Sequence, residues 1–373
     1  MVRAALWQQP LGQVTCSEEQ LQELLRMHMQ QGTAALVFPL LLQDPSVSSY
    51  ARTQMLSVCA QTMQQQVQLQ HILTRSWAAL EQAGIQPVLL KGAGLAALYP
   101  EMHQRAWGDI DLFVGKANYH TACATMRACF PNALKFDEEL EHYKHYNLIA
   151  DGVSIELHRV TVDLQHPLDA RRYAEMEAWG MAHSEPLTLN GLPVRVPAPT
   201  FNVLFVFLHA WEHMLTQGAN IRQLCDLALL QHRYRDNVDE RVLLGWLKSL
   251  RLLDVWQLVQ YCMVQSLGLP RPSALFFSTD VADRTERLLA DLLDGKMRET
   301  KEESGAESRA ESEAEAGEKK RVNRFVRKWE TMKGRNRNAA RIAQYSPQYA
   351  RHMRATTWWH GLSRLFAKDR KWE

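Results

Sequence analysis

Hydrophobic positions in the first quarter of the chain recur at the spacing of an α-helix. Residues 17–33 and 51–83 are rich in Gln, Leu and Met and contain almost no Gly or Pro. Their apolar side chains lie on one face of a helical projection, and those of the second stretch include Leu56, Met63, Val67 and Ile72. This pattern predicts two amphipathic helices.

The hydrophobic period changes after Gly84. Residues 86–90 form a short apolar run, which predicts a buried strand, and residues 93–99 suit a short helix that ends at Pro100. Asp109 to Val114 begins with a period of two, which places the acids on one face of a strand and Ile110 and Leu112 on the other.

The remaining pattern predicts a helix, two hairpins and a long helical region. Residues 117–129 suit a helix, and strands at 146–149 and 153–160 are joined around Asp151-Gly152, a strong hairpin dipeptide. Asn190-Gly191 marks a second hairpin. From Pro199 to about Gly295 the spacing is helical again.

These changes of pattern divide the chain into five predicted segments. They are an N-terminal helical region (1–83), a strand-containing core (84–165), a hairpin with a C-terminal helical domain (166–297), an acidic flexible linker (298–320) and a basic helical tail (321–373). The linker has no large apolar residue in its acidic stretch, so it cannot bury enough surface to order itself.

Composition narrows the class of protein. The 373 residues contain no apolar run near the ~20 residues that span a bilayer, and the first residues lack a secretory signal, so we expect a cytoplasmic protein. Six scattered cysteines without a C-x-x-C pair predict free thiols rather than a zinc knuckle or a redox motif.

The net charge of +2 hides a strong asymmetry. Residues 299–318 hold 8 acidic and 2 basic residues, whereas residues 319–373 hold 16 basic and 3 acidic ones. The rest of the chain is mildly acidic, so we expect the basic tail to dock on the protein's own body. An anionic membrane surface and nucleic acid are the alternative partners. The sequence does not indicate the oligomeric state.

The candidate catalytic residues lie on predicted strands of the core and on the glycine turn after the first of these strands. Asp109 and Asp111 are spaced i, i+2 on a strand, so both carboxylates project from one face and can share a hard divalent cation. Glu156 supplies a third acid on another strand, as a two-metal site requires. The glycine turn at Lys91-Gly92 lets backbone N–H groups approach phosphates. Together these parts suit a metal–triphosphate substrate.

These residues also carry a family resemblance. The sequence resembles the uncharacterised nucleotidyltransferase family of the DNA polymerase β-like superfamily at residues 88–95, 98–100, 105 and 108–112, with further matches at 155–158, 208–209 and 221–228. The resemblance implies an α+β fold, with a mixed-sheet nucleotidyltransferase core and large helical N- and C-terminal additions. It also implies metal-dependent transfer of a nucleoside monophosphate from a nucleoside triphosphate to an acceptor hydroxyl or amine, which the sequence does not identify.

The resemblance assigns roles to individual residues. Asp109 and Asp111 match the metal-binding pair, and Glu156 matches the third acid. Together the three carboxylates would hold two Mg²⁺ ions, and Mn²⁺ is the other suitable ion. Gly92 matches the glycine of the phosphate-binding turn. The wider superfamily has Gly-Ser or Gly-Gly there, whereas this chain has Gly92-Ala93 and offers no hydroxyl.

Nearby charged residues have two interpretations each. Lys91 and Arg105 can supply phosphate contacts as charge, or form salt bridges to neighbouring acids. His158 can orient Glu156, assist proton transfer, or be a structural histidine. Arg222 lies four residues before Asp226, which suits either an ion pair on a helix surface or a helical region that closes over the acceptor side.

Two other functions fit parts of the sequence. A non-catalytic nucleotide- or partner-binding protein that retains the fold would explain Gly92-Ala93, although it gives no reason to bring three carboxylates together. His209-Ala210-Trp211-Glu212-His213 spells H-x-x-E-H, an inverted zinc-peptidase motif whose two histidines share one helix face. Nothing else in the chain suggests a peptidase.

Overall fold

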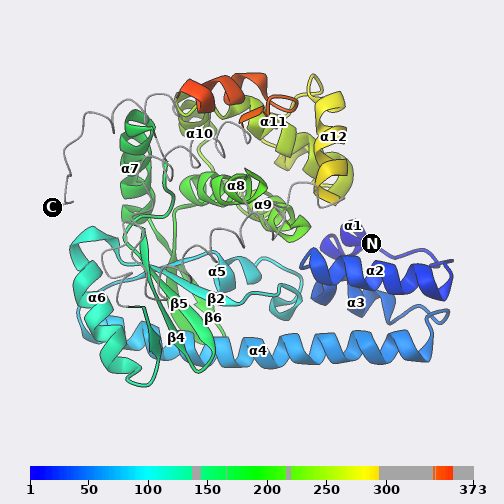
Figure 1. Cartoon of the computed structure of the whole chain (residues 1–373), viewed down its shortest axis with the longest axis horizontal. Coiled ribbons are helices and arrows are strands. Elements are labelled where there is room, and N and C mark those ends of the chain that lie inside the picture. The colour runs from blue at the N-terminus through cyan, green and yellow to red at the C-terminus, as the bar shows by residue number, and fades with distance from the viewer. Residues whose placement is uncertain (137–143, 165, 216–219, 294–338, 341, 356–373) are drawn as a thin grey trace, which may run out of the picture.

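The computed structural model describes residues 1–136, 144–164, 166–215, 220–293, 339–340 and 342–355 (Figure 1). The long helices of the N-terminal part are α2 (Glu18–Gln30), α3 (Ala34–Leu41) and α4 (Ser49–Gln82), after a short α1 (Val2–Leu6). The later helices are α5 (Gly92–Ala96), α6 (Gly115–Cys129), α7 (Pro167–Ala182), α8 (Pro199–Leu215), α9 (Ile221–Arg233), α10 (Glu240–Ser249), α11 (Leu253–Cys262) and α12 (Ala282–Leu293). Short helical turns lie at η1 (Met102–Gln104), η3 (Met263–Leu267) and η4 (Arg271–Ser273).

A mixed five-stranded sheet lies at the centre of the core. Its strands are β1 (Val88–Leu90), β2 (Asp109–Phe113), β3 (Leu134–Lys135), β4 (His145–Ala150) and β5 (Val153–His158), in the order β1-β2-β5-β4-β3. β2 and β5 run parallel, and the other neighbours are antiparallel. The α+β fold class is therefore confirmed, with helices before and after the sheet.

Both hairpin dipeptides turn the chain where the sequence predicts. Asp151 and Gly152 have φ of 51° and 79°, and Asn190 and Gly191 have φ of 47° and 84°, so each pair occupies the left-handed region that a two-residue hairpin turn requires. The second turn joins β6 (Glu185–Leu189) to β7 (Leu192–Val196). Apolar residues of this hairpin pack in the core of the five-stranded sheet.

Helix α4 links two hydrophobic clusters (Figure 1). Its C-terminal half lies in the sheet cluster, which includes Trp77, Ile110, Tyr146 and Ile155. Its N-terminal end, with Met55, lies in the helical cluster, which also holds most of α3, α8, α9 and α11. This arrangement explains how one helix can be amphipathic along only part of its length.

The middle of α4 differs from the sequence prediction. Of the four apolar residues that suggested its buried face, Leu56, Met63 and Val67 are 57%, 49% and 72% exposed, and Ile72 is buried. The side chain of Gln66 instead donates hydrogen bonds to the carbonyls of His103 and Arg105. A polar face of the helix therefore supports the loop that leads into β2.

The described part of the predicted tail packs against the helical domain. Ile342, Tyr345 and Ala350 are buried in the helical cluster, and the Tyr349 ring contacts the Trp211 ring of α8 edge to face. This segment also contacts α11, where the Ser346 hydroxyl donates to the Asp254 carboxylate (Figure 1). The acidic linker and the rest of the basic tail lie outside the described residues. None of the described helices combines the length and apolar character needed to cross a membrane.

Candidate active site

Adjacent parallel strands bring the three predicted acids together. Asp109 and Asp111 lie on β2, and Glu156 lies on β5 directly beside Asp111 in the sheet register. Each of the three carboxylates offers an oxygen within 4.8 Å of the others. The apolar residues Ile110 and Ile155 alternate with them and are buried in the sheet cluster, so the pleat directs the acids to the opposite face.

Asp111 is the most enclosed of the three acids. Its Oδ1 accepts hydrogen bonds from the Lys91 Nζ at 3.1 Å and from the His158 Nε2 at 2.9 Å. Burial opposes ionisation, yet Lys91 and His158 together hold the pKa of Asp111 well below its ordinary value. Its Oδ2 is buried and has no hydrogen-bond partner within the described residues, which leaves a lone carboxylate oxygen inside the cluster.

His158 lies between two of the carboxylates. Its Nε2 is 2.9 Å from the Asp111 Oδ1 and 3.2 Å from the Glu156 Oε2. Burial disfavours the charged ring, but the hydrogen bonds to both acids outweigh it and raise the pKa of His158. The geometry therefore makes His158 a bridge between Asp111 and Glu156 rather than an isolated core histidine.

Asp109 has a different electrostatic environment from its neighbour. The nearby Asp111 carboxylate and burial both raise the pKa of Asp109, and the Lys91 ammonium only partly offsets them. The Lys91 side chain is 15% exposed, and the pKa of its ammonium is raised because the attraction of the three carboxylates outweighs its burial. The Lys91 ammonium therefore faces all three acids.

The Lys91-Gly92 turn approaches the acids through an unusual backbone. Lys91 has φ 46° and ψ −132°, and Gly92 has φ 37°. A Cβ at Gly92 would lie 3.4 Å from the Asp109 carbonyl oxygen and 3.4 Å from the Trp107 ring. Ala93 is fully buried in the sheet cluster. The residue after the glycine therefore packs in the core, which explains why a small apolar side chain is accommodated there.

Arg105 makes a long-range ion pair. Its Nε and Nη2 donate to the two carboxylate oxygens of Asp226 on α9 at 2.7 and 2.8 Å, and the Tyr99 hydroxyl donates to the same carboxylate at 2.8 Å. The Arg105 side chain is 5% exposed, and its Nη1 has no partner within the described residues. The salt bridge therefore joins the loop before β2 to the helical domain.

Among the described residues, Arg222 does not form the ion pair with Asp226 that is one of the two interpretations of their helical spacing. The carboxylate of Asp226 is taken by Arg105 and Tyr99, whereas the Arg222 guanidinium donates to the carbonyl of Ala106. Burial and the neighbouring Arg105 lower the pKa of Arg222. The ion-pair interpretation is therefore wrong for this pair, because a tertiary contact competes with the neighbour on the same helix.

The H-x-x-E-H histidines lie near the carboxylates. The rings of His209 and His213 on α8 are 4.5 Å apart, edge to face. Burial and the Lys91 charge lower the pKa of both, that of His213 to about 4. In the part of the chain that the structure describes, two groups of three side chains can hold a metal, and neither includes these histidines. Among the described residues, the two histidines of the motif therefore have no third side chain with which to bind a zinc ion.

Sequence reasoning missed His145, which belongs to the second of these groups with Glu156 and His158. The antiparallel register pairs His145 with His158 across β4 and β5. That pairing follows from the two-residue turn at Asp151-Gly152, so counting outward from the dipeptide would have found it. Lys144, beside it, lies 3.9 Å from Glu212 of α8.

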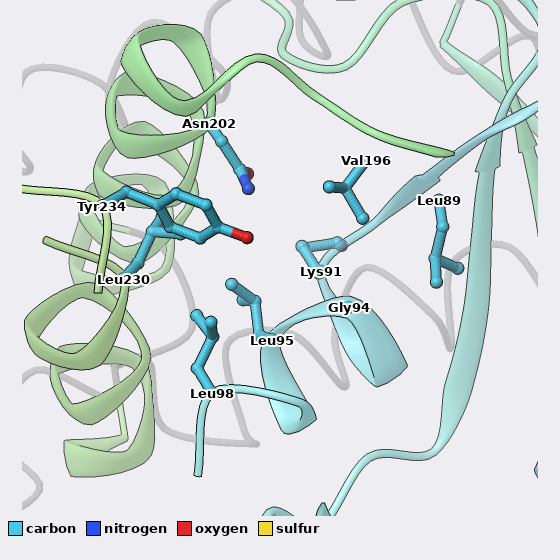
Figure 2. A pocket seen from close by; sticks show the side chains of 9 residues that line it. All are labelled: Leu89, Lys91, Gly94, Leu95, Leu98, Val196, Asn202, Leu230 and Tyr234. Atoms are coloured by element: carbon cyan, nitrogen blue, oxygen red, sulfur yellow. The ribbon is translucent and has the colours of Figure 1, made fainter. Parts of the chain in front are cut away.

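A small pocket borders the Lys91 turn. It lies between α5, β7, α8 and α9, and the side chains of Leu95, Leu98, Asn202 and Tyr234 line it (Figure 2). Its volume of about 10 Å³ has room for roughly one water molecule. A nucleotide base therefore cannot enter this pocket.

The family model of the uncharacterised nucleotidyltransferases matches residues 17–268, which include every candidate site residue. No curated protein matches the sequence significantly. A solved structure, of an antigenic nucleotidyltransferase-like protein from Paracoccidioides brasiliensis, is 14% identical and covers 55% of this chain and 92% of its own, with a TM-score of 0.33. This structural similarity is too low to support any conclusion about the site. The length of the family match shows that the chain belongs to the uncharacterised nucleotidyltransferase family and is a transferase.

Proposed function

We propose that the protein transfers a nucleoside monophosphate from a nucleoside triphosphate to an acceptor hydroxyl or amine, and that Asp109, Asp111 and Glu156 hold the divalent ions this requires. One observation carries the proposal. The three carboxylates converge within 4.8 Å, and the buried Oδ2 of Asp111 has no partner among the described residues. A buried carboxylate oxygen without a partner is costly unless a ligand completes it.

The donor set suits Mg²⁺ or Mn²⁺. All three side chains offer oxygen atoms, which are the ligands that these hard cations prefer. Three acids also outnumber the two basic side chains that contact them, Lys91 and His158, so the cluster has room for more positive charge. When bound, two such ions would neutralise the triphosphate and stabilise the attacking and leaving oxygens.

The chain's own residues would orient the reacting groups. The Lys91 ammonium and the backbone at Gly92 lie beside the acids and would seat the triphosphate. The acceptor oxygen or nitrogen forms a bond to the α-phosphorus, the bond to the β-phosphate bridging oxygen breaks, and pyrophosphate leaves. The carboxylate nearest the acceptor would take the acceptor's proton.

The two arginines would act differently. Arg105 is held by Asp226, so we assign it the role of fixing the loop before β2, and a phosphate contact through its Nη1 stays a prediction. Arg222 fixes the same loop through the carbonyl of Ala106 and, like Arg105, brings a buried positive charge near Asp109. His158 would hold Asp111 and Glu156 in register.

The test is incubation of the protein with labelled nucleoside triphosphates, Mg²⁺ and a cell extract, followed by identification of the labelled acceptor. Asp109→Asn is expected to lower labelling at least about 100-fold, the scale of losing one catalytic group. Asp151→Asn is the matched control, because it makes the same change at an exposed turn of the same sheet and should label normally.

Nucleotide binding separates catalysis from mere binding. Titration of each Mg²⁺–nucleotide against wild type and Asp109→Asn is expected to show tighter binding when Mg²⁺ is present and weaker binding in the variant. Metal-independent binding that is indifferent to Asp109, together with no labelled acceptor, would contradict the proposal and favour a non-catalytic nucleotide-binding protein.

A further inference from the structure

A second group of potential ligands lies beside the three carboxylates on the same sheet. β4 and β5 pair His145 with His158, and Glu156 lies two residues before His158 on the same face. The two imidazole rings are 5.1 Å apart, and each of the three side chains offers one ligand atom within 4.8 Å of the other two. Two imidazoles and one carboxylate therefore converge from neighbouring strands.

The environment of His158 resembles that of a metal-bound histidine. Its Nδ1 lies 3.4 Å from the Val160 carbonyl oxygen, and its Nε2 points toward the carboxylates. Histidine ligands commonly donate one ring N–H to a backbone carbonyl, which directs the other nitrogen to the metal. The His158 Nε2 and the Glu156 Oε2 are 3.2 Å apart, close to the about 3.3 Å that separates two ligands of a tetrahedral zinc ion.

We propose that His145, Glu156 and His158 form a second metal site, for a zinc-class divalent ion, next to the three carboxylates. Imidazole nitrogen suits Zn²⁺ and its neighbours among the transition metals, whereas Mg²⁺ prefers an all-oxygen set. Modest side-chain rotations of His145 and Glu156 would shorten the remaining separations to bonding distance, and a water molecule would complete four-fold coordination. The site itself does not rest on the proposed nucleotidyl transfer.

The two metal groups share one ligand. Glu156 belongs both to the Asp109–Asp111–Glu156 group and to the His145–Glu156–His158 group. An ion at the second group would take Glu156 and would replace the hydrogen bond from His158 to Asp111. Zinc is therefore expected to oppose Mg²⁺ at the first group, so that the same strand would serve both catalysis and inhibition.

The experiment titrates Co²⁺ and then Zn²⁺ into the full-length protein without nucleotide. Co²⁺ takes zinc sites and absorbs visible light when its ligands are tetrahedral. Wild type is expected to give this absorption, and Zn²⁺ is expected to displace it. His145→Ala should weaken Co²⁺ affinity at least about tenfold, the lower end of the loss seen when a metal site's supporting groups are removed.

His213→Ala is the matched control, because it removes a histidine of the rival H-x-x-E-H motif and should leave the absorption unchanged. His145→Gln is a second variant, with a larger side chain, and circular dichroism would confirm that all variants fold. Any of three results would overturn the proposal. They are an absorption in both His145 variants that equals that of wild type, no absorption in wild type, and loss of the absorption in His213→Ala.

The outcome is independent of the transfer assay. His145-dependent Co²⁺ binding in a protein that labels no acceptor would contradict the proposed function and leave the zinc site standing. If labelling depends on Asp109 but Co²⁺ binding does not depend on His145, the proposed function is supported and the zinc site is contradicted.

Discussion

At the residue scale, Lys91 combines a strained backbone conformation with a charge that is attracted to the three carboxylates. Its φ of 46° lies in the left-handed region, which side chains with a Cβ rarely occupy and which costs about 1–3 kcal/mol. Its ammonium is the cation that faces the three carboxylates and holds the pKa of Asp111 low. Such strain persists only where the surrounding structure imposes it, and here the electrostatic contact supplies a reason.

A pair of variants separates the strain from the charge. Lys91→Ala and Lys91→Gly both remove the ammonium, but only glycine is relaxed at this φ. We expect Lys91→Gly to be the more stable of the two by about 1 kcal/mol in urea unfolding, the reverse of the usual order in a regular element. Equal stability, or a more stable Lys91→Ala, would show that the backbone is not strained there.

At the element scale, the buried bond between Arg105 and Asp226 ties the loop before β2 to α9. The two residues are 121 positions apart in the sequence, and both oxygens of the carboxylate are used. Tyr99 and the Arg222 contact to Ala106 strengthen the same junction. The position of the strand that carries Asp109 and Asp111 therefore depends on a helix of the other hydrophobic cluster.

Breaking this ion pair from either side leaves an uncompensated buried charge. Asp226→Leu or Arg105→Met alone is expected to cost about 3–5 kcal/mol of unfolding free energy, measured by urea denaturation. The double variant should be less destabilised than the sum of the single variants, because neither charge remains. Simple additivity would show that the two side chains do not interact in solution.

The elements differ in how well the sequence predicts them. Asp151-Gly152 and Asn190-Gly191 specify their turns locally, and Ile110 and Ile155 reveal the faces of their strands, so the three acids could be placed on one sheet in advance. Arg105 and Asp226 could not be paired, because their contact is tertiary. The exposed apolar face in the middle of α4 was also missed, since periodicity reveals a face but not what covers it.

At the scale of the whole molecule, residues near the end of the chain complete the helical domain. Arg284 of α12 donates to Asp254 of α11 at 3.1 Å and to the Tyr345 carbonyl at 2.9 Å. His352 lies 2.7 Å from Asp169 of α7. The described segment 342–355 is therefore held by specific contacts and apolar burial, and not by net charge alone.

Removing Arg284 should loosen this segment. Arg284→Ala is expected to accelerate amide hydrogen exchange in residues 342–355 about tenfold or more, because a hydrogen bond to a charged group contributes roughly 1.5–3 kcal/mol. Arg287→Ala, an exposed arginine on the same helix, is the control and should leave the exchange unchanged. Equal exchange in the two variants would mean that apolar packing alone retains the segment.

Helix α8 has a consequence for when the protein becomes competent during its synthesis. His209 on α8 is near enough to Lys91 and Asp111 for their charges to act on its pKa, and Trp211, nearly opposite on the helix, packs against Tyr349. The wall behind the site is thus finished by residues that the ribosome adds more than 100 positions later. A nascent chain that already contains all three acids still lacks the contact between Tyr349 and Trp211. The three carboxylates are therefore synthesised well before the residues that pack behind α8.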